Sequence, residues 1–388
     1  MENVEVVQNE FKEKPVEGIK DELNAELVKK RKAKKKAKKT LMADEVRPLR
    51  KIKTSCFAIS VQKGGVGKTT TTSNLALTLA NKGFKVLVID TDSQGSLTGL
   101  LNVYGKTIEE EIDGLADIYS EYIESKYECK DNSFSIENIK KYIVRPTYPV
   151  TRLDRTEDGK FKAVSEAVEF GFDLIPGDLA LSEDDILLHR VKSGGLVLYH
   201  IINLIKQEMD YDYILIDCPP SLGILTYNAI ASATEGVIIP IGLEIMTIRG
   251  AKNIVKLVAQ IQDELNKLKQ FKIVHRGILG IVMNEYMKRS RTQRIFEEQV
   301  NLWYPLKKFE SQIPSRSDCN TAHAEGLLFI QKSKDVREVF DNLADEIIME
   351  DIRRQDETES VIVRETGLAY DKFVEMMEKN KDNNKIVD

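Results

Sequence analysis

Residues 63 to 70 combine glycines, lysines and threonines at a spacing that could bind the phosphates of a nucleotide. Such a loop needs glycines so that its backbone N–H groups can turn toward an anion. Lys68 could reach the β- and γ-phosphates, and the Thr69 hydroxyl could ligate Mg²⁺. We therefore expect a nucleotide site here, formed by the run that follows the apolar stretch 57–61: Lys63, Gly64, Gly65, Val66, Gly67, Lys68, Thr69 and Thr70.

A second lysine distinguishes this run from the ordinary phosphate loop. In the pattern G-x-x-x-x-G-K-[ST] the first glycine would fall at Gln62, and Lys63 stands just inside the loop instead. One interpretation is an ordinary loop beside a solvated lysine. The other is a second cation for the phosphates, because phosphoryl transfer is accelerated mainly by positioning and by positive charge.

Two carboxylates stand at or just beyond the ends of apolar, strand-like runs. Asp92 follows the run 85–90, and Asp217 ends the run 213–217. A carboxylate at the carboxyl end of a strand can orient water near a γ-phosphate or hold Mg²⁺. Taken alone, the cluster of Asp, Gln and Gly after residue 90 is more typical of a turn and helix cap.

Apolar runs of strand length alternate with helical segments along most of the chain. We expect strands at 56–61, 85–90, 172–175, 213–217, 236–241 and 276–283, and helices at 69–82, 191–208 and 246–269. This alternation predicts a doubly wound, mostly parallel α/β sheet with helices on both faces. Ligands of such sheets bind at the carboxyl ends of the strands.

Charge divides the chain into a core domain and two extensions. The net charge is −5, yet residues 29–40 hold nine Lys or Arg and no acid. We expect a mobile polybasic extension at 1–52, a P-loop domain at 53–348 and a charged extension at 349–388. Residues 103 to about 170 are polar, tyrosine-rich and irregular, so we expect an insertion there, with a hairpin that turns near Asp158 and Gly159.

Cysteine and histidine usage argues against a metal centre. The four cysteines and four histidines are scattered, with no C-x-x-C pair. Cys56 and Cys218 lie in or beside apolar runs, where buried thiols are expected. We see no apolar stretch of membrane-spanning length and no signal-peptide core, and we expect a cytoplasmic protein.

Together the motifs resemble the deviant Walker A ATPases of the ParA and MinD group, over roughly residues 54 to 345. The switch segment of that group reads D-x-D-P-Q-G, which this chain matches except for Ser93 in place of proline. The string Y-D-Y-I-L-I-D-C-P-P-S-L from Tyr211 to Leu222 matches the Walker B region of the group. The resemblance implies a P-loop ATPase with ATP and Mg²⁺ as cofactors.

The resemblance also implies roles for single residues. Lys63 would reach the nucleotide of the partner subunit in an ATP-bound homodimer, and Lys68 would hold the phosphates of its own subunit. Asp92 would position the attacking water, and with Thr69 and Asp217 it would help to hold Mg²⁺. Asn284, at the end of another strand, would hydrogen-bond the adenine edge.

The function implied by the resemblance is segregation of plasmid or chromosomal DNA at the nucleoid. The ATP-bound dimer would bind non-specific DNA, and a ParB-like partner would stimulate hydrolysis. Basic residues that could contact DNA phosphates are found in the N-terminal extension and in the core: Lys34, Lys35, Lys36, Lys288, Arg289, Arg291 and Arg316.

Two alternatives use the same switch. A MinD-like protein would act at a membrane surface, where polybasic segments also bind. However, MinD relatives anchor through a C-terminal amphipathic helix, and residues 371–388 show no wide apolar stripe. A cargo-positioning ATPase would act on a protein assembly, and the sequence does not separate it from a DNA-partition protein. Iron-protein and tyrosine-kinase relatives are disfavoured, because paired cysteines and a C-terminal tyrosine cluster are missing from the sequence.

Overall fold

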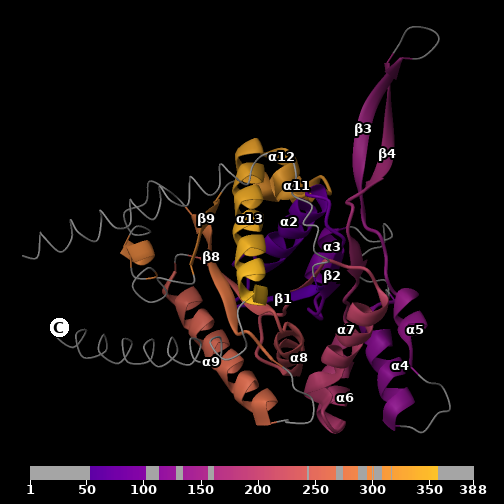
Figure 1. The fold of residues 1–388 in the computed structure, drawn as a ribbon. Helices are drawn as coiled ribbons and strands as arrows, with labels where there is room; N and C mark the ends of the chain where they lie inside the picture. The colour runs from indigo at the N-terminus through magenta and orange to yellow at the C-terminus, as the bar shows by residue number, and fades with distance from the viewer. Residues whose placement is uncertain are drawn as a thin grey trace, which may run out of the picture. The chain divides into compact units, whose positions relative to one another are not determined.

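The centre of the computed structural model is a seven-stranded sheet whose paired strands are all parallel (Figure 1). The structure describes residues 53–101, 113–127, 134–155, 161–242, 244–267, 274–286, 295–298, 300, 308–315 and 317–356. In spatial order the strands are β5 (Asp173–Ile175), β2 (Val86–Asp90), β6 (Tyr213–Asp217), β1 (Ser55–Ile59), β7 (Gly236–Ile241), β8 (Ile278–Tyr286) and β9 (Lys308–Pro314). The strand order therefore reverses direction near β1, where ligands bind in such sheets.

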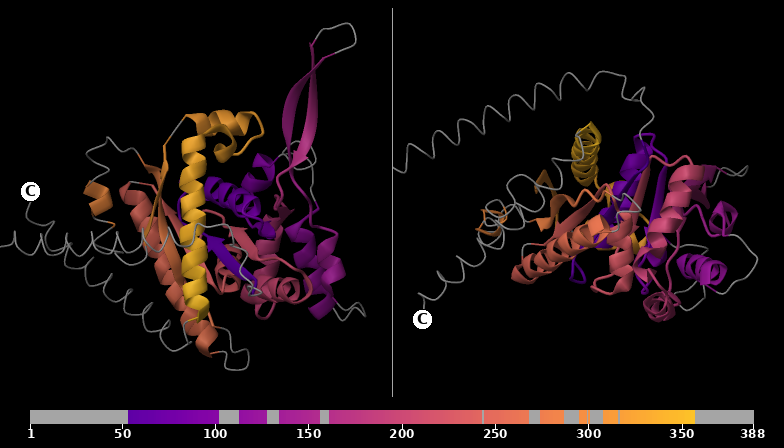
Figure 2. Two further views of the ribbon diagram at one scale, coloured as in Figure 1. Left: turned by 45° about the horizontal axis from the view of Figure 1, so that its top comes forward. Right: turned by 60° about the horizontal axis from the view of Figure 1, so that its bottom comes forward.

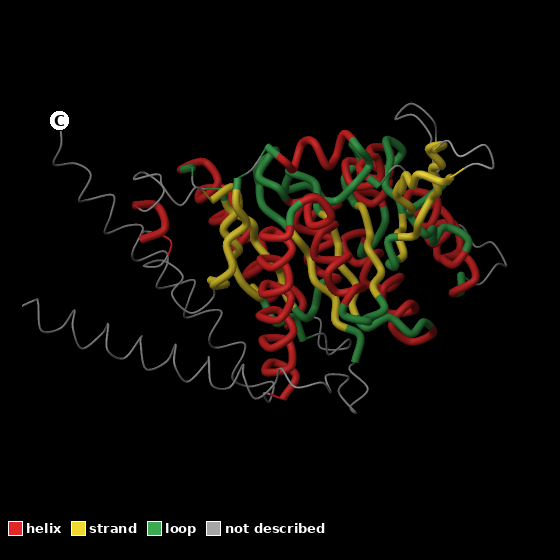
Figure 3. Tube along the Cα trace, turned by 90° about the horizontal axis from the view of Figure 1, so that it is seen from above, coloured by secondary structure: helices red, strands yellow, loops and turns green. Residues whose placement is uncertain are grey.

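Helices cover both faces of this sheet (Figure 3). Cys56 and Ala58 of β1 point to one face, and Phe57 and Ile59 point to the other, as the two-residue period of a strand requires. One face packs against α2 (Lys68–Asn81), α3 (Ser96–Leu100), α12 (Phe329–Lys332) and α13 (Lys334–Asp356). The other packs against α4 (Leu115–Tyr127), α5 (Ile136–Lys140), α6 (Leu181–Arg190), α7 (Val197–Glu208), α8 (Ile224–Ser232) and α9 (Ile245–Lys267). The predicted doubly wound fold is confirmed.

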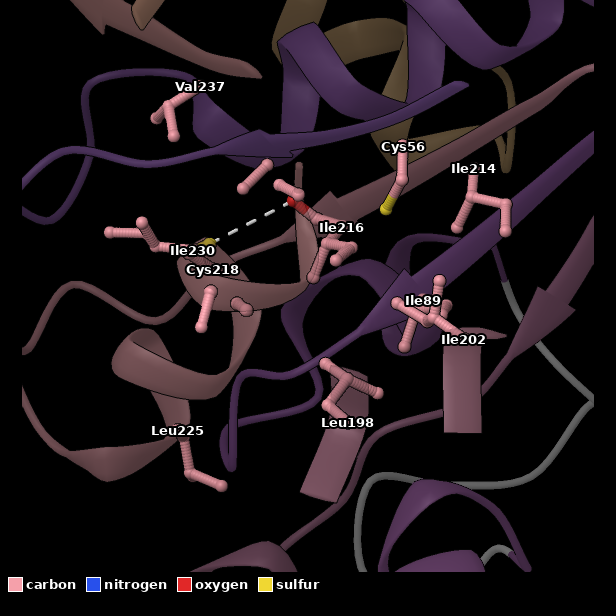
Figure 4. Close-up of a cluster of buried hydrophobic side chains, with 14 of the residues drawn as sticks. Cys56, Ile89, Leu198, Ile202, Ile214, Ile216, Cys218, Leu225, Ile230 and Val237 are labelled. Atoms are coloured by element: carbon pink, nitrogen blue, oxygen red, sulfur yellow. Dashed lines mark hydrogen bonds between the residues drawn. The ribbon is translucent and has the colours of Figure 1, made fainter. Parts of the chain in front are cut away.

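Cys56 of β1 and Cys218, directly after β6, are core residues. Figure 4 shows Cys56 and Cys218 among aliphatic side chains, with the Cys218 thiol 3.9 Å from the carbonyl oxygen of Ile216. Burial raises the pKa of the Cys56 thiol to about 12 and also raises that of Cys218. The two thiols therefore remain protonated and pack as small apolar groups, as the sequence predicts.

Part of the expected insertion belongs to the core instead. The insertion expected at 103 to about 170 includes residues 115–127. This segment is not irregular: it forms helix α4, and its apolar side chains pack into the core. Leu115, Ile118, Tyr119 and Tyr122 are buried at the spacing i, i+3, i+4 and i+7, which is the period of one helix face. This period is not obvious from the sequence, because two of the four buried positions are tyrosines, which are often classed as polar.

The expected hairpin is confirmed. Strands β3 (Thr147–Arg155) and β4 (Phe161–Glu169) pair antiparallel as a separate two-stranded sheet (Figures 1 and 2). Its base is closed by a hydrogen bond of 3.0 Å from the Phe170 N–H to the Pro146 carbonyl oxygen. The described side chains of β4 are almost all exposed, so the hairpin adds little to the core.

The C-terminal boundary lies beyond the predicted residue 349. Helix α13 continues through Asp356 and packs on β9 and α2 (Figure 2). Arg354 is buried, and its Nη2 donates to the carbonyl oxygen of Ile278 at 2.6 Å, while the Ser55 hydroxyl donates to Asp351 at 2.7 Å. Charged residues are tolerated there because they have hydrogen-bond partners. Of the described helices, none is long and apolar enough to cross a membrane.

A buried carboxyl group in α6 makes the stability of the fold depend on pH. Asp184 is 4% exposed, and one of its carboxyl oxygens has no hydrogen-bond partner. Burial, together with the charges of Asp117, Asp178 and Glu183, raises its pKa to about 7.

Because the folded-state pKa of Asp184 exceeds its unfolded value, the folded protein binds more protons, and stability falls as pH rises from about 4 to about 7. We expect Asp184→Asn to stabilise the protein by about 2 kcal/mol at pH 8 and by little near pH 4. Thermal unfolding at the two pH values tests this. An equal shift at both would contradict it, and Asp185→Asn on the same helix is the control.

Candidate active site

The predicted phosphate loop lies between β1 and α2, at the carboxyl ends of the central strands. Gly65 and Gly67 have φ angles of 71° and 77°, a left-handed conformation that side chains other than glycine rarely adopt. Helix α2 begins directly after Gly67, so its free N–H groups and its dipole face the loop. The local geometry is therefore that of an anion site.

Lys68 is held inside this loop. Its side-chain nitrogen donates to the carbonyl oxygen of Lys63 at 2.9 Å, and the residue is 7% exposed. Burial lowers the pKa of Lys68, and the nearby carboxylates of Asp217 and Asp92 oppose that shift. The ammonium group thus lies where it can bind a phosphate, close to both predicted carboxylates.

Thr69 and Asp217, two of the expected Mg²⁺ ligands, lie within hydrogen-bond distance of each other. The Thr69 hydroxyl donates to one oxygen of Asp217 at 2.8 Å, and the Thr72 hydroxyl donates to the other at 2.9 Å. Burial raises the pKa of Asp217 to about 6. A hydroxyl and a carboxylate are oxygen donors of the kind Mg²⁺ prefers alongside nucleotide phosphates, so these residues fit the ion. When bound there, Mg²⁺ would neutralise charge on the phosphates.

The switch segment begins at Asp90, the last residue of β2, and is tied there to helix α3. Asp90 accepts hydrogen bonds of 2.9 Å from both the backbone N–H and the hydroxyl of Thr98. Burial, with Asp217 alongside, raises the pKa of Asp90 to about 8. Asp92 accepts a bond of 3.0 Å from the Gln94 N–H and is 9% exposed. Asp90 therefore organises the loop, and Asp92 lies close enough to Lys68 and Asp217 to interact with their charges.

The Lys63 side chain is paired with a residue outside the loop. Its ammonium group forms an ion pair with the carboxylate of Glu244, which precedes α9. The Lys63 side chain is 29% exposed and that of Glu244 is 68% exposed. Within one subunit, therefore, the Lys68 ammonium group is hydrogen-bonded inside the loop, whereas the partly exposed Lys63 ammonium group is paired with a carboxylate outside it.

Asn284 is near the loop, at the end of β8. Its side-chain nitrogen donates to the carbonyl oxygen of Val66 at 2.8 Å. The adenine contact of Asn284 remains a prediction. The predicted DNA residues lie outside the described part of the chain: Lys34, Lys35, Lys36, Lys288, Arg289, Arg291 and Arg316.

Sequence reasoning missed two contributors to the site. Thr72 is one helical turn from Lys68, on the side of α2 that faces Asp217. Glu244 follows the carboxyl end of β7, so the rule that singled out Asp92 and Asp217 could have found it.

Comparisons with known proteins agree with this geometry. The family described as an AAA domain matches residues 54–271, more than half of the chain. The chromosome-partitioning ATPase Soj of Treponema pallidum is 32% identical over 267 residues, which cover 69% of this chain and 85% of that protein. The chain belongs to the ParA/Soj family. It is therefore a ParA-type ATPase of the P-loop class, and its nucleotide cofactor is ATP.

Two further proteins resemble this ParA/Soj-family chain over most of its length. The sporulation initiation inhibitor protein Soj of Bacillus subtilis is 29% identical over 294 residues, or 75% of this chain and 97% of that protein. The fold resembles that of cobyrinic acid a,c-diamide synthase from Mycobacterium smegmatis with bound ATP analogue and magnesium. That likeness has a TM-score of 0.56 at 22% identity and covers 79% of this chain and 98% of that chain.

Proposed function

We propose that this ATPase is a switch that dimerises on ATP, binds non-specific DNA, and is released when a ParB-like partner stimulates hydrolysis. The dimer would associate with the nucleoid and move plasmid or chromosomal DNA. The observation that carries the proposal is the placement of the two loop lysines. Lys68 is hydrogen-bonded inside the loop of its own subunit, whereas the partly exposed Lys63 is paired with the exposed Glu244 outside the loop.

Exposed apolar side chains around the nucleotide edge support association through this face. Leu179, Leu222 and Met246 follow the carboxyl ends of β5, β6 and β7, and they are 59%, 39% and 60% exposed. Apolar side chains gathered at one edge are typical of an interaction surface. A second copy placed there would cover them and bring the Lys63 of each subunit toward the nucleotide of the other.

A basic stripe on α9 supports contact with DNA. Arg249, Lys252 and Lys256 occupy positions i, i+3 and i+7, which share one face of a helix, and Arg249 and Lys256 are exposed. Each phosphate contact contributes about 0.9 to the slope of log affinity against log salt. With the predicted basic residues of the extension and of the core, this stripe would give salt-sensitive binding without sequence preference.

We expect the full chain to bind random-sequence duplex DNA tightly only with ATP, and more weakly as salt rises. The measurement is DNA binding with ATP, with ADP and without nucleotide, at two salt concentrations. Deletion of residues 1–40 should weaken binding and flatten its salt dependence. Arg249→Glu with Lys256→Glu should do the same, whereas Lys85→Glu, before the amino end of β2, is the control.

Other outcomes would replace the proposal. Equal affinity for DNA with ATP, with ADP and without nucleotide would make the polybasic extension an independent DNA-binding segment rather than part of a switch. Failure to bind DNA in any nucleotide state would favour the membrane or cargo alternatives, which vesicles of anionic lipid and isolation of bound proteins would then distinguish.

A further inference from the structure

Asn284 is buried against the phosphate loop, and every hydrogen-bonding group of its amide faces a partner. Its Nδ2 donates to the carbonyl oxygens of Val66 at 2.8 Å and of Gly67 at 3.3 Å. Its Oδ1 accepts from the backbone N–H of Glu285 at 3.0 Å. The residue is only 3% exposed. The amide is thus part of the loop's internal hydrogen bonding.

The backbone of β8 determines which way this amide points. Glu285 has a φ angle of 56°, a left-handed conformation that is uncommon for residues other than glycine, asparagine and aspartate. The Glu285 N–H donates to Oδ1 of Asn284, which leaves Nδ2 to face the loop carbonyls. A reversed amide would place its oxygen against two carbonyl oxygens, with no proton between them.

Gly67 and Asn284 are fitted to each other. A Cβ atom on Gly67 would lie 1.9 Å from Nδ2 of Asn284, far inside contact distance. Glycine is therefore required at position 67 for two reasons, its φ angle of 77° and the close approach of this side chain. The contact joins the end of β8 to the residue directly before α2.

Because peptide bonds are planar, the hydrogen bonds from Asn284 to the loop carbonyls also determine where the loop N–H groups point. In a trans peptide the carbonyl oxygen and the following N–H point in opposite directions. Holding the carbonyls of Val66 and Gly67 toward Asn284 therefore directs the N–H groups of Gly67 and Lys68 the opposite way. N–H groups turned inward in this manner form the concave surface that binds an anion.

We propose that Asn284 is a positioning residue that holds the phosphate loop in its binding shape, independently of the base. This role differs from the adenine contact predicted from the sequence. An adenine-reading residue acts only when a nucleotide is present, and it acts on the base. A residue that braces the loop acts in the empty protein as well, and its loss weakens binding of any ligand through the phosphates.

The test is hydrogen exchange of the nucleotide-free full chain, comparing wild type with Asn284→Ala and Asn284→Ser. We expect exchange to become several-fold faster in residues 62–70 for both variants. The matched control is Asn228→Ala, because Asn228 is also buried and donates to two carbonyl oxygens, those of Gly194 at 2.8 Å and Ile224 at 3.0 Å. Unchanged exchange in residues 62–70 of the two Asn284 variants would overturn the proposal.

A second measurement separates the two roles in binding. For folded Asn284→Ser protein we expect affinity for ATP to fall about tenfold, and affinity for base-free tripolyphosphate to fall by a similar factor. Circular dichroism establishes that each variant is folded at the temperature used. A loss confined to ATP, with tripolyphosphate unaffected, would assign Asn284 to the base and overturn the bracing role. Asn228→Ala should change neither affinity.

Discussion

Lys63→Ala is expected to leave ATP binding in place, to abolish the ATP-dependent dimer and to lower stimulated hydrolysis by roughly 10³-fold or more. The reason is that Lys68 remains in the loop, hydrogen-bonded to a backbone carbonyl that the substitution keeps. In the proposed dimer, the substitution removes a cation that one subunit supplies to the phosphates of the other, and such a cation contributes about 10³ to 10⁵ in rate. Calorimetry, sedimentation with ATP, and phosphate release measure the three quantities.

Two controls make the Lys63 result specific. Lys82→Ala removes a lysine at the far end of α2, where it pairs with Asp345, and should change none of the three quantities. Glu244→Gln keeps Lys63 but removes its partner within the subunit, so the ATP dimer should form at least as readily as in wild type. A Lys63→Ala protein that dimerises and hydrolyses ATP normally would rule out the shared site.

Asp92→Ala is expected to trap the ATP-bound dimer. The carboxylate lies near Lys68 and Asp217, where it could orient the attacking water. Without it, ATP and the dimer should persist while hydrolysis falls by about 10² to 10⁴-fold, the range for loss of a group that handles the proton of the attacking water. The lifetime of the dimer after removal of free ATP is the decisive measurement.

Asp178 provides a matched control for Asp92. Each residue accepts a hydrogen bond of 3.0 Å from the backbone N–H two residues further along, Ala180 in one case and Gln94 in the other. Asp178→Ala therefore removes the same kind of turn bond from a neighbouring loop and should leave hydrolysis unchanged. If it slowed hydrolysis as much as Asp92→Ala, the effect would belong to loop structure rather than to the attacking water.

The central strands were predictable because their burial leaves a continuous apolar run. Tyr213–Asp217 and Gly236–Ile241 agree with the predicted strands in every residue, and β1 and β2 agree to within two residues at each end. The site residues on the loop and at the ends of these strands followed from the same logic. Thr69 and Asp217 lie within hydrogen-bond distance, although 148 positions separate them in sequence.

Features determined by packing between distant segments were not predictable in the same way. The charged end of α13 is buried because Arg354 and Asp351 form hydrogen bonds with residues of β8 and β1. No pattern within α13 itself predicts these contacts. The position of Glu244 after β7 could have been noticed, but its pairing with Lys63 of the phosphate loop depends on how the two segments lie in the fold. Asn284 was correctly placed at a strand end, but its contacts with Val66 and Gly67 depend on how closely β8 approaches the loop.

The hairpin of β3 and β4 has a consequence for how this chain can be altered. Its two strands satisfy each other's backbone groups, and its ends are joined by the bond between Phe170 and Pro146. The seven-stranded sheet therefore does not depend on the ladder between residues 147 and 169. That segment could therefore be lengthened, shortened or exchanged between relatives during evolution, while the strand pairing of the seven-stranded sheet remains the same.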